Sequence, residues 1–157
     1  DNSPMFNRIL MSYINFATLA VDGLEFKFKA GKIFGDELPT YEAFTLGGYE
    51  SVRGWSNGDL AVSRSFIDGT LEYTFPFINM VSGSLFIDAG SDFGTQKDVP
   101  GKPGELLNKS GSGYSLGGTV SWDTSIGQFK FFVASQNFSF DDPNYGIEFQ
   151  AKNKKNK

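Results

Sequence analysis

The stretch Leu24-Glu25-Phe26-Lys27-Phe28-Lys29-Ala30 alternates strictly between apolar and charged side chains. Its leucine, two phenylalanines and alanine fall on one side, and its glutamate and two lysines on the other. A period of two is typical of a β-strand, in which successive side chains point to opposite faces. This stretch therefore predicts a strand with one apolar face and one polar face.

The same period recurs along most of the chain, and no segment shows the apolar stripe of a helix. We predict seven strands, at about residues 9–21, 24–35, 62–75, 81–90, 113–123, 127–138 and 145–151. Several of them exceed the usual ~5–6 residues and approach the ~9–11 residues that cross a bilayer at a tilt.

The predicted connections differ in length in a way that favours a membrane barrel. Short or moderate connections, at 22–23, 76–80, 124–127 and 137–144, contrast with two long ones at 36–61 and 91–112. Outer-membrane barrels have short turns at one end and long loops at the other, with aromatic residues near the strand ends. Such aromatic residues here are Tyr73, Phe75, Phe77, Tyr114, Trp122 and Tyr145. The sequence predicts an all-β, antiparallel transmembrane β-barrel, with a soluble β-sandwich as the alternative.

Strict alternation also predicts which side chains face lipid and which face the lumen. The lipid-facing set is Leu24, Phe26, Phe28, Leu71, Tyr73, Leu85, Ile87, Val120, Phe129, Phe131, Ile147 and Phe149. The lumen-facing set is Glu25, Lys27, Glu72, Thr119, Lys130 and Glu148. Seven strands leave two unpaired edges in lipid, whereas bacterial single-chain barrels have even strand numbers. We therefore expect the chain, whose start lacks an initiator Met, to be part of a larger barrel.

Composition excludes several kinds of chemistry. The 157 residues contain no Cys and no His, which excludes disulfides, Cys- or His-ligated zinc, a Cys nucleophile and a His-dependent triad. A net charge of −4 argues against nucleic acid as a partner. Carboxylates such as Glu50, Glu72, Asp88 and Asp92 have no spacing that indicates glycoside hydrolysis. We predict no enzymatic activity, no cofactor and no metal site, and interpret 140–144 as a polar turn rather than a calcium site.

Two motifs carry the functional prediction. In the first long connection, Gly47-Gly48 precedes Val52-Arg53-Gly54-Trp55, and an Arg held between such neighbours suggests a loop folded inward onto an acceptor. In a later strand, Phe86, Asp88 and Gly90 share the polar face, which makes Asp88 a plausible bidentate partner for Arg53. The alternatives are a surface Arg beside a buried Trp and an ordinary lumen-facing carboxylate.

Together these motifs resemble the inward loop and the wall-strand motif of the outer membrane protein 85 superfamily, the bacterial surface antigen barrels. The resemblance covers residues 9 to 151, as the C-terminal strands of a barrel that has about sixteen in the family. It implies that residues 1–151 form the C-terminal portion of the barrel domain and that Arg53, at the tip of the loop, pairs with Asp88. Residues 152–157, rich in Lys and Asn, are expected to be a basic disordered tail.

Two further segments resemble the cyanobacterial and chloroplast-envelope branch of that family. They are the Pro- and Gly-rich stretch 98–104 and the turn 123–127, where Ser125 stands in place of the branch's usual Pro. Unlike bacterial members, which usually finish on an aromatic residue, the chain continues past Phe149. The resemblance therefore favours the chloroplast outer envelope, with a bacterial or mitochondrial outer membrane as the other locations.

The function implied by the resemblance is handling of polypeptides. Such a barrel inserts β-barrel proteins into an outer membrane or translocates unfolded proteins across it, without covalent chemistry. Its expected partners are unfolded polypeptides, outer-membrane lipids and other subunits of an assembly or import complex. The alternatives are a passive solute porin, which does not need the inward Arg loop, and a soluble β-sandwich binding module.

Overall fold

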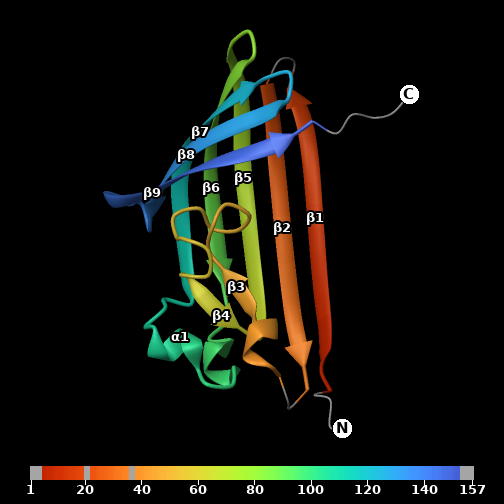
Figure 1. The fold of residues 1–157 in the computed structure, drawn as a ribbon, viewed down its shortest axis with the longest axis vertical. Helices are drawn as coiled ribbons and strands as arrows, with labels where there is room; N and C mark the ends of the chain where they lie inside the picture. The colour runs from red at the N-terminus through yellow and green to blue at the C-terminus, as the bar shows by residue number, and fades with distance from the viewer. Residues whose placement is uncertain (1–4, 20–21, 36–37, 153–157) are drawn as a thin grey trace.

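A single antiparallel sheet of seven strands dominates the fold (Figure 1). The computed structural model describes residues 5–19, 22–35 and 38–152. In spatial order the strands are β1 (Asn7–Leu19), β2 (Asp22–Phe34), β5 (Ser65–Ile78), β6 (Val81–Ser91), β7 (Ser112–Asp123), β8 (Gly127–Gln136) and β9 (Ser139–Ala151). This order follows the chain, and it confirms the seven predicted strands of the sheet. Because they form one sheet and not two packed sheets, the β-sandwich alternative is wrong.

Strand β9 begins much earlier than the sequence predicts. The turn expected over 137–144 is reduced to Asn137 and Phe138, both with positive φ, and β9 starts at Ser139. Ser139 pairs with Gln136 of β8, but residues 140–143 have no partner there, because the register shifts between Ala134 and Gln136, and pairing resumes with Asn144 opposite Ala134. The residues that are typical of a turn thus form an irregularity within β9 rather than a separate connection.

Two other turns also differ from the prediction. Strand β5 continues through Pro76 to Ile78, and the β5–β6 ladder shifts its register between these two residues. A register shift is one of the few places where a sheet accommodates proline. The turn expected at 22–23 belongs to β2 instead, and the connecting residues 20–21 lie outside the described residues.

The register confirms the predicted division of the two faces. Phe26 lies opposite Leu71, and Leu71 lies opposite Ile87, so that the apolar side chains continue from strand to strand on one face, the outer face. On the other face, here called the inner face, Glu72 lies opposite both Glu25 and Phe86. Most large side chains of the outer face are exposed.

The long connections contain small elements that the alternation pattern does not predict. A second sheet pairs β3 (Phe44–Leu46) with β4 (Ala61–Ser63), and the turns include η1 (Thr40–Glu42), η2 (Thr95–Asp98) and α1 (Pro103–Leu106). In the part of the chain that the structure describes, no helix has the length and apolar character needed to cross a membrane.

These elements build a small apolar core at the long-loop end of the sheet. Its members are Ile33, Leu38, Phe44, Leu46, Val52, Trp55, Leu60, Ala61 and Phe66. The segment between β3 and β4 contributes three of its residues, so the core holds both ends of that segment in place.

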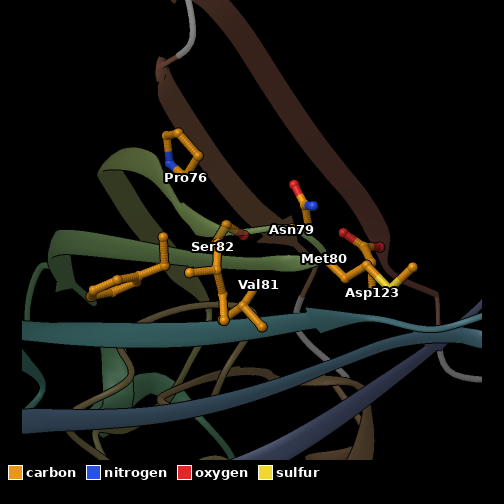
Figure 2. Close-up of a pocket in the computed structure, with 8 residues that line it drawn as sticks. Pro76, Asn79, Met80, Val81, Ser82 and Asp123 are labelled. Carbon is orange, nitrogen blue, oxygen red and sulfur yellow. The ribbon is translucent and has the colours of Figure 1, made fainter.

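The opposite end of the sheet carries the tip of the β5–β6 hairpin. A pocket there is lined by residues that include Pro76, Asn79, Val81 and Ser82 (Figure 2). The backbone N–H of Asp123 donates to the Met80 carbonyl at 2.8 Å, which ties the tip to the end of β7. Asp123 is the single carboxylate of this lining. Nearby, the backbone of Lys152 is still bonded to Ile126, and the rest of the predicted tail lies outside the described residues.

Candidate functional site: the anchored inward loop

The segment 47–60 connects β3 to β4 and is here called the inward loop. It lies against the inner face of the seven-stranded sheet (Figure 1). It leaves β3 through Gly47 and Gly48, whose φ angles of 108° and 90° lie in the left-handed region that favours glycine. The Gly48 N–H donates to the Trp55 carbonyl at 2.8 Å and closes the loop. A Cβ on Gly47 would lie 2.5 Å from the Ser56 carbonyl oxygen. Both glycines are therefore required for this loop conformation.

Arg53 is the centre of the loop, and its side chain is only 4% exposed. Its Nε and Nη2 donate to the two oxygens of Asp88 at 2.9 and 2.8 Å, so the predicted contact is present and bidentate. Its Nη1 donates to Glu72 Oε2 at 2.7 Å. The guanidinium also lies over the Phe86 ring, with Cζ 3.2 Å from the ring centroid. Arg53 thus joins β5 to β6 through two carboxylates and one aromatic ring.

The charge on Arg53 is maintained by these partners. Burial alone would lower the pKa of the guanidinium, but the hydrogen bonds and charges of Asp88 and Glu72 outweigh it and raise the pKa. A buried Arg with charge-assisted bonds to two carboxylates is firmly fixed in position. The cluster is therefore an anchor for the loop.

The two carboxylates are themselves positioned by hydroxyl groups from the strands. Asp88 is fully buried, and it accepts from Thr70 Oγ1 at 2.9 Å and from Ser115 Oγ at 3.1 Å. Glu72 accepts from Ser84 Oγ at 2.6 Å. Neither these hydroxyl contacts nor the bond between Glu72 and Arg53 is predicted by the sequence. Their positions depend on which strand residues lie opposite one another, which local sequence does not specify.

Small residues of the wall receive the large side chains of the loop. A Cβ on Gly90 would lie 2.8 Å from Cγ2 of Val52, and one on Gly113 would overlap the Trp55 ring. Gly54 of the loop approaches the wall in turn, because a Cβ there would lie 2.9 Å from that of Ser115. The glycines of both predicted motifs are thus explained by close packing.

The loop also reaches the last two strands. The carbonyl of Arg53 accepts a hydrogen bond from Asn144 Nδ2 on β9 at 2.7 Å. The Tyr49 ring packs against Phe132 of β8, with the ring centroids 5.4 Å apart. Burial raises the pKa of the Tyr49 hydroxyl, and the nearby Glu148 carboxylate raises it further. Asn144 was not among the predicted site residues, because the sequence places it in a turn.

The carboxylates considered for hydrolysis are not arranged as a catalytic pair. Glu72 and Asp88 converge, but on the guanidinium of Arg53. Asp92 accepts from the backbone N–H groups of Gly94 and Gln96, which makes it a local turn carboxylate. Among the described residues, no cluster of three or more His, Cys, Asp or Glu side chains could hold a metal ion.

A sheet of long antiparallel strands, with an exposed apolar outer face and a loop bonded to its polar inner face, defines a membrane β-barrel with an internal loop. The Omp85 superfamily domain matches residues 2–152, and the chain belongs to this superfamily. The family membership expected from the two motifs is therefore confirmed.

Similar proteins include several from the chloroplast outer envelope. The chain is 36% identical over 121 residues to outer envelope protein 80 of Arabidopsis thaliana, covering 77% of this chain and 16% of that protein. It is 33% identical over 117 residues to Arabidopsis outer envelope protein 39, covering 74% and 32%. It is 44% identical over 82 residues to the chloroplast protein TOC75 of Oryza sativa subsp. japonica, covering 52% and 10%. The chain thus spans 32% or less of the length of each of these relatives.

The fold is also similar to a solved bacterial structure. BamA from Haemophilus ducreyi, crystallised without POTRA domains 1–3, superimposes with a TM-score of 0.70. The match covers 92% of this chain and 34% of that chain at 16% identity, so it shows a shared fold. The seven strands therefore have the arrangement of part of a larger barrel.

Proposed function

We propose that these strands are the C-terminal portion of an outer-membrane barrel that handles polypeptides. In this proposal the barrel inserts β-barrel proteins into the membrane or translocates unfolded proteins across it. The observation that carries the proposal is the buried Arg53, which holds a loop against the inner wall through Asp88 and Glu72. A loop fixed in this way gives the interior one defined arrangement.

The inner face has the chemistry that an unfolded chain requires. An extended polypeptide exposes backbone N–H and C=O groups that are costly to place in an apolar environment. Lys27, Glu25 and Lys130 lie on the inner face with their side chains partly exposed, and they offer such groups hydrogen-bonding partners. No covalent step is part of this function, and we propose that the protein is not an enzyme.

The names of the relatives support the location and the partners that we propose. Because several of them are chloroplast outer envelope proteins, we assign this barrel to that membrane. Its outer face, with exposed side chains such as Leu85, Ile87 and Phe131, would contact the acyl chains of lipids. Its other partners would be unfolded polypeptides and further subunits of an import or assembly complex, without nucleic acid.

A passive solute porin is the second candidate function for this fold. The anchored loop distinguishes it from polypeptide handling. A porin requires the same alternating strands, but it does not require a buried Arg bonded to two wall carboxylates. The experiment compares Arg53→Ala with Arg64→Ala in the full-length protein, because Arg64 makes a hydrogen bond to the Gly35 carbonyl, away from the cluster.

Two activities are measured in proteoliposomes for each variant: uptake or membrane insertion of an unfolded precursor, and efflux of a small dye. We expect Arg53→Ala to lower polypeptide handling by about tenfold or more, and Arg64→Ala to leave it near the level of the unmodified protein. If Arg53→Ala changes only the dye efflux, the porin function is supported and the proposal is wrong.

A further inference from the structure

Asn144 connects the last strand of the sheet directly to the centre of the inward loop. Its Nδ2 donates to the backbone carbonyl of Arg53 at 2.7 Å, across 91 residues of sequence. Asn144 lies opposite Ala134 in the β8–β9 ladder, beside the register shift between Ala134 and Gln136. This contact is separate from the contacts of the Arg53 side chain, which go to β5 and β6.

The Arg53 carbonyl depends on this bond. Arg53 is buried, with 3% of its surface exposed, and a buried carbonyl without a partner is destabilising. In the described ranges, no backbone N–H donates to this carbonyl. Gly54 lies directly against the Ser135 carbonyl, so no side chain can separate the loop from β8 at this point.

Strand β9 approaches the inward loop at two residues, Asn144 and Glu148, and the Glu148 carboxylate lies near the Tyr49 hydroxyl. Within the sheet described here, β9 pairs with β8. A displacement of β9 relative to the inward loop would stretch the hydrogen bond from Asn144 to the Arg53 carbonyl. Because the acceptor is the carbonyl of Arg53, such a displacement would also pull on the residue whose side chain is bonded to Asp88 and Glu72.

We propose that Asn144 is a positioning residue that couples the last strand to the inward loop. Its amide sets the position of β9 relative to Arg53, while Asp88 and Glu72 set the position of the loop relative to β5 and β6. The proposal concerns the coupling alone, and it holds whichever substrate the barrel handles.

The test measures two distances in the full-length protein, reconstituted in bilayers, with spin labels on introduced cysteines. This chain contains no cysteine, so labels within it are placed at chosen positions only. One label pair, at positions 57 and 142, reports the distance from the loop to β9. The other pair, at 57 and 89, reports the distance from the loop to β6. Asn57, Ala89 and Asp142 are all exposed.

The test variant is Asn144→Asp, which keeps the size of the side chain but replaces the donating NH₂ with an oxygen. We expect the loop-to-β9 distribution to widen about twofold and the loop-to-β6 distribution to keep its width. The matched control is Gln150→Glu, the same amide-to-acid change on the same face of β9, where no side-chain hydrogen bond to the loop is present among the described residues. Both distributions should stay narrow in this control.

Three outcomes would overturn the coupling. The first is an unchanged loop-to-β9 distribution in Asn144→Asp. The second is equal widening of both distributions, because the whole loop would then have detached and Asn144 would be only a part of its packing. The third is a failure of Asn144→Gln, which retains the donor, to give a narrower loop-to-β9 distribution than Asn144→Ala does. Because the third outcome compares only Asn144→Gln with Asn144→Ala, it tests the coupling even if Asn144→Asp does not fold.

Discussion

The backbone N–H and the side-chain Nε of Arg53 both donate to the same oxygen, Oδ2 of Asp88, at 3.0 and 2.9 Å. One carboxylate oxygen therefore fixes the main chain of the loop as well as its guanidinium. Nη2 of Arg53 holds the other oxygen of Asp88, so the carboxylate cannot rotate freely. Only a planar group with several donors can satisfy Asp88 and Glu72 together.

Replacement of Arg53 should release the loop, more completely with Ala than with Lys. Arg53→Ala leaves the buried Asp88 and the partly exposed Glu72 without their cation, a change that costs about 3–5 kcal/mol in buried pairs. Arg53→Lys keeps the charge but loses the planar fork, so we expect it to retain part of the stability. The measurement is the rate of protease cleavage in the loop together with the urea midpoint of unfolding, with Arg64→Ala as the control. Equal cleavage rates for Arg53→Lys and the unmodified protein would contradict the role of the fork.

The two carboxylates should differ in importance. Asp88 is fully buried and accepts five hydrogen bonds, whereas Glu72 is 18% exposed at its side chain and accepts two. We expect Asp88→Asn to lower the free energy of unfolding by about 3–5 kcal/mol and Glu72→Gln by about 1–3 kcal/mol. Urea unfolding of both variants under the same conditions checks this order, and a larger loss for Glu72→Gln would contradict it.

Gly54 should not tolerate even one additional methyl group. Its Cβ would press on the Ser135 carbonyl and on Ser115, both of which belong to the wall. We expect Gly54→Ala to cost about 1–3 kcal/mol and to increase protease cleavage of the loop. Gly69→Ala is the control, because its Cβ would meet only the Lys27 carbonyl at an ordinary 3.6 Å. If the protease cleaves the loop as slowly in Gly54→Ala as in Gly69→Ala, the wall adjusts to the added methyl group and this prediction is wrong.

The sequence was a good guide to the sheet, because alternation is a local property. The motif pair Arg53 and Asp88 was also identified, and the structure contains their contact. The roles of Glu72, Ser115 and Asn144 were missed, because they depend on register and on strands far apart in sequence. Asn144 shows the difficulty well. The sequence before it, Asp141-Asp142-Pro143, is typical of a turn, but it lies within β9, at a register shift after which Asn144 pairs with Ala134.

Neighbouring positions on β8 should report opposite environments in a bilayer. Phe131 belongs to the outer face and lies opposite Val120 and Ile147, whereas Lys130 belongs to the inner face and lies opposite Glu148. We expect a fluorophore on a cysteine at position 131 to be quenched by lipid-attached quenchers. A fluorophore at position 130 should be quenched by aqueous iodide instead. The reverse pattern would mean that the two faces have been assigned wrongly.

The hydrogen bonds of Arg53 also imply an order in which its partners become available during synthesis of the chain. Its partners lie progressively later in the chain, with Glu72 19 residues away, Asp88 35 residues away and Asn144 91 residues away. A chain that emerges from the ribosome N-terminus first presents Arg53 long before its last partner. The loop therefore remains incompletely bonded until β9 has been made and paired. Among these bonds, the one from Asn144 is the last that the growing chain can complete.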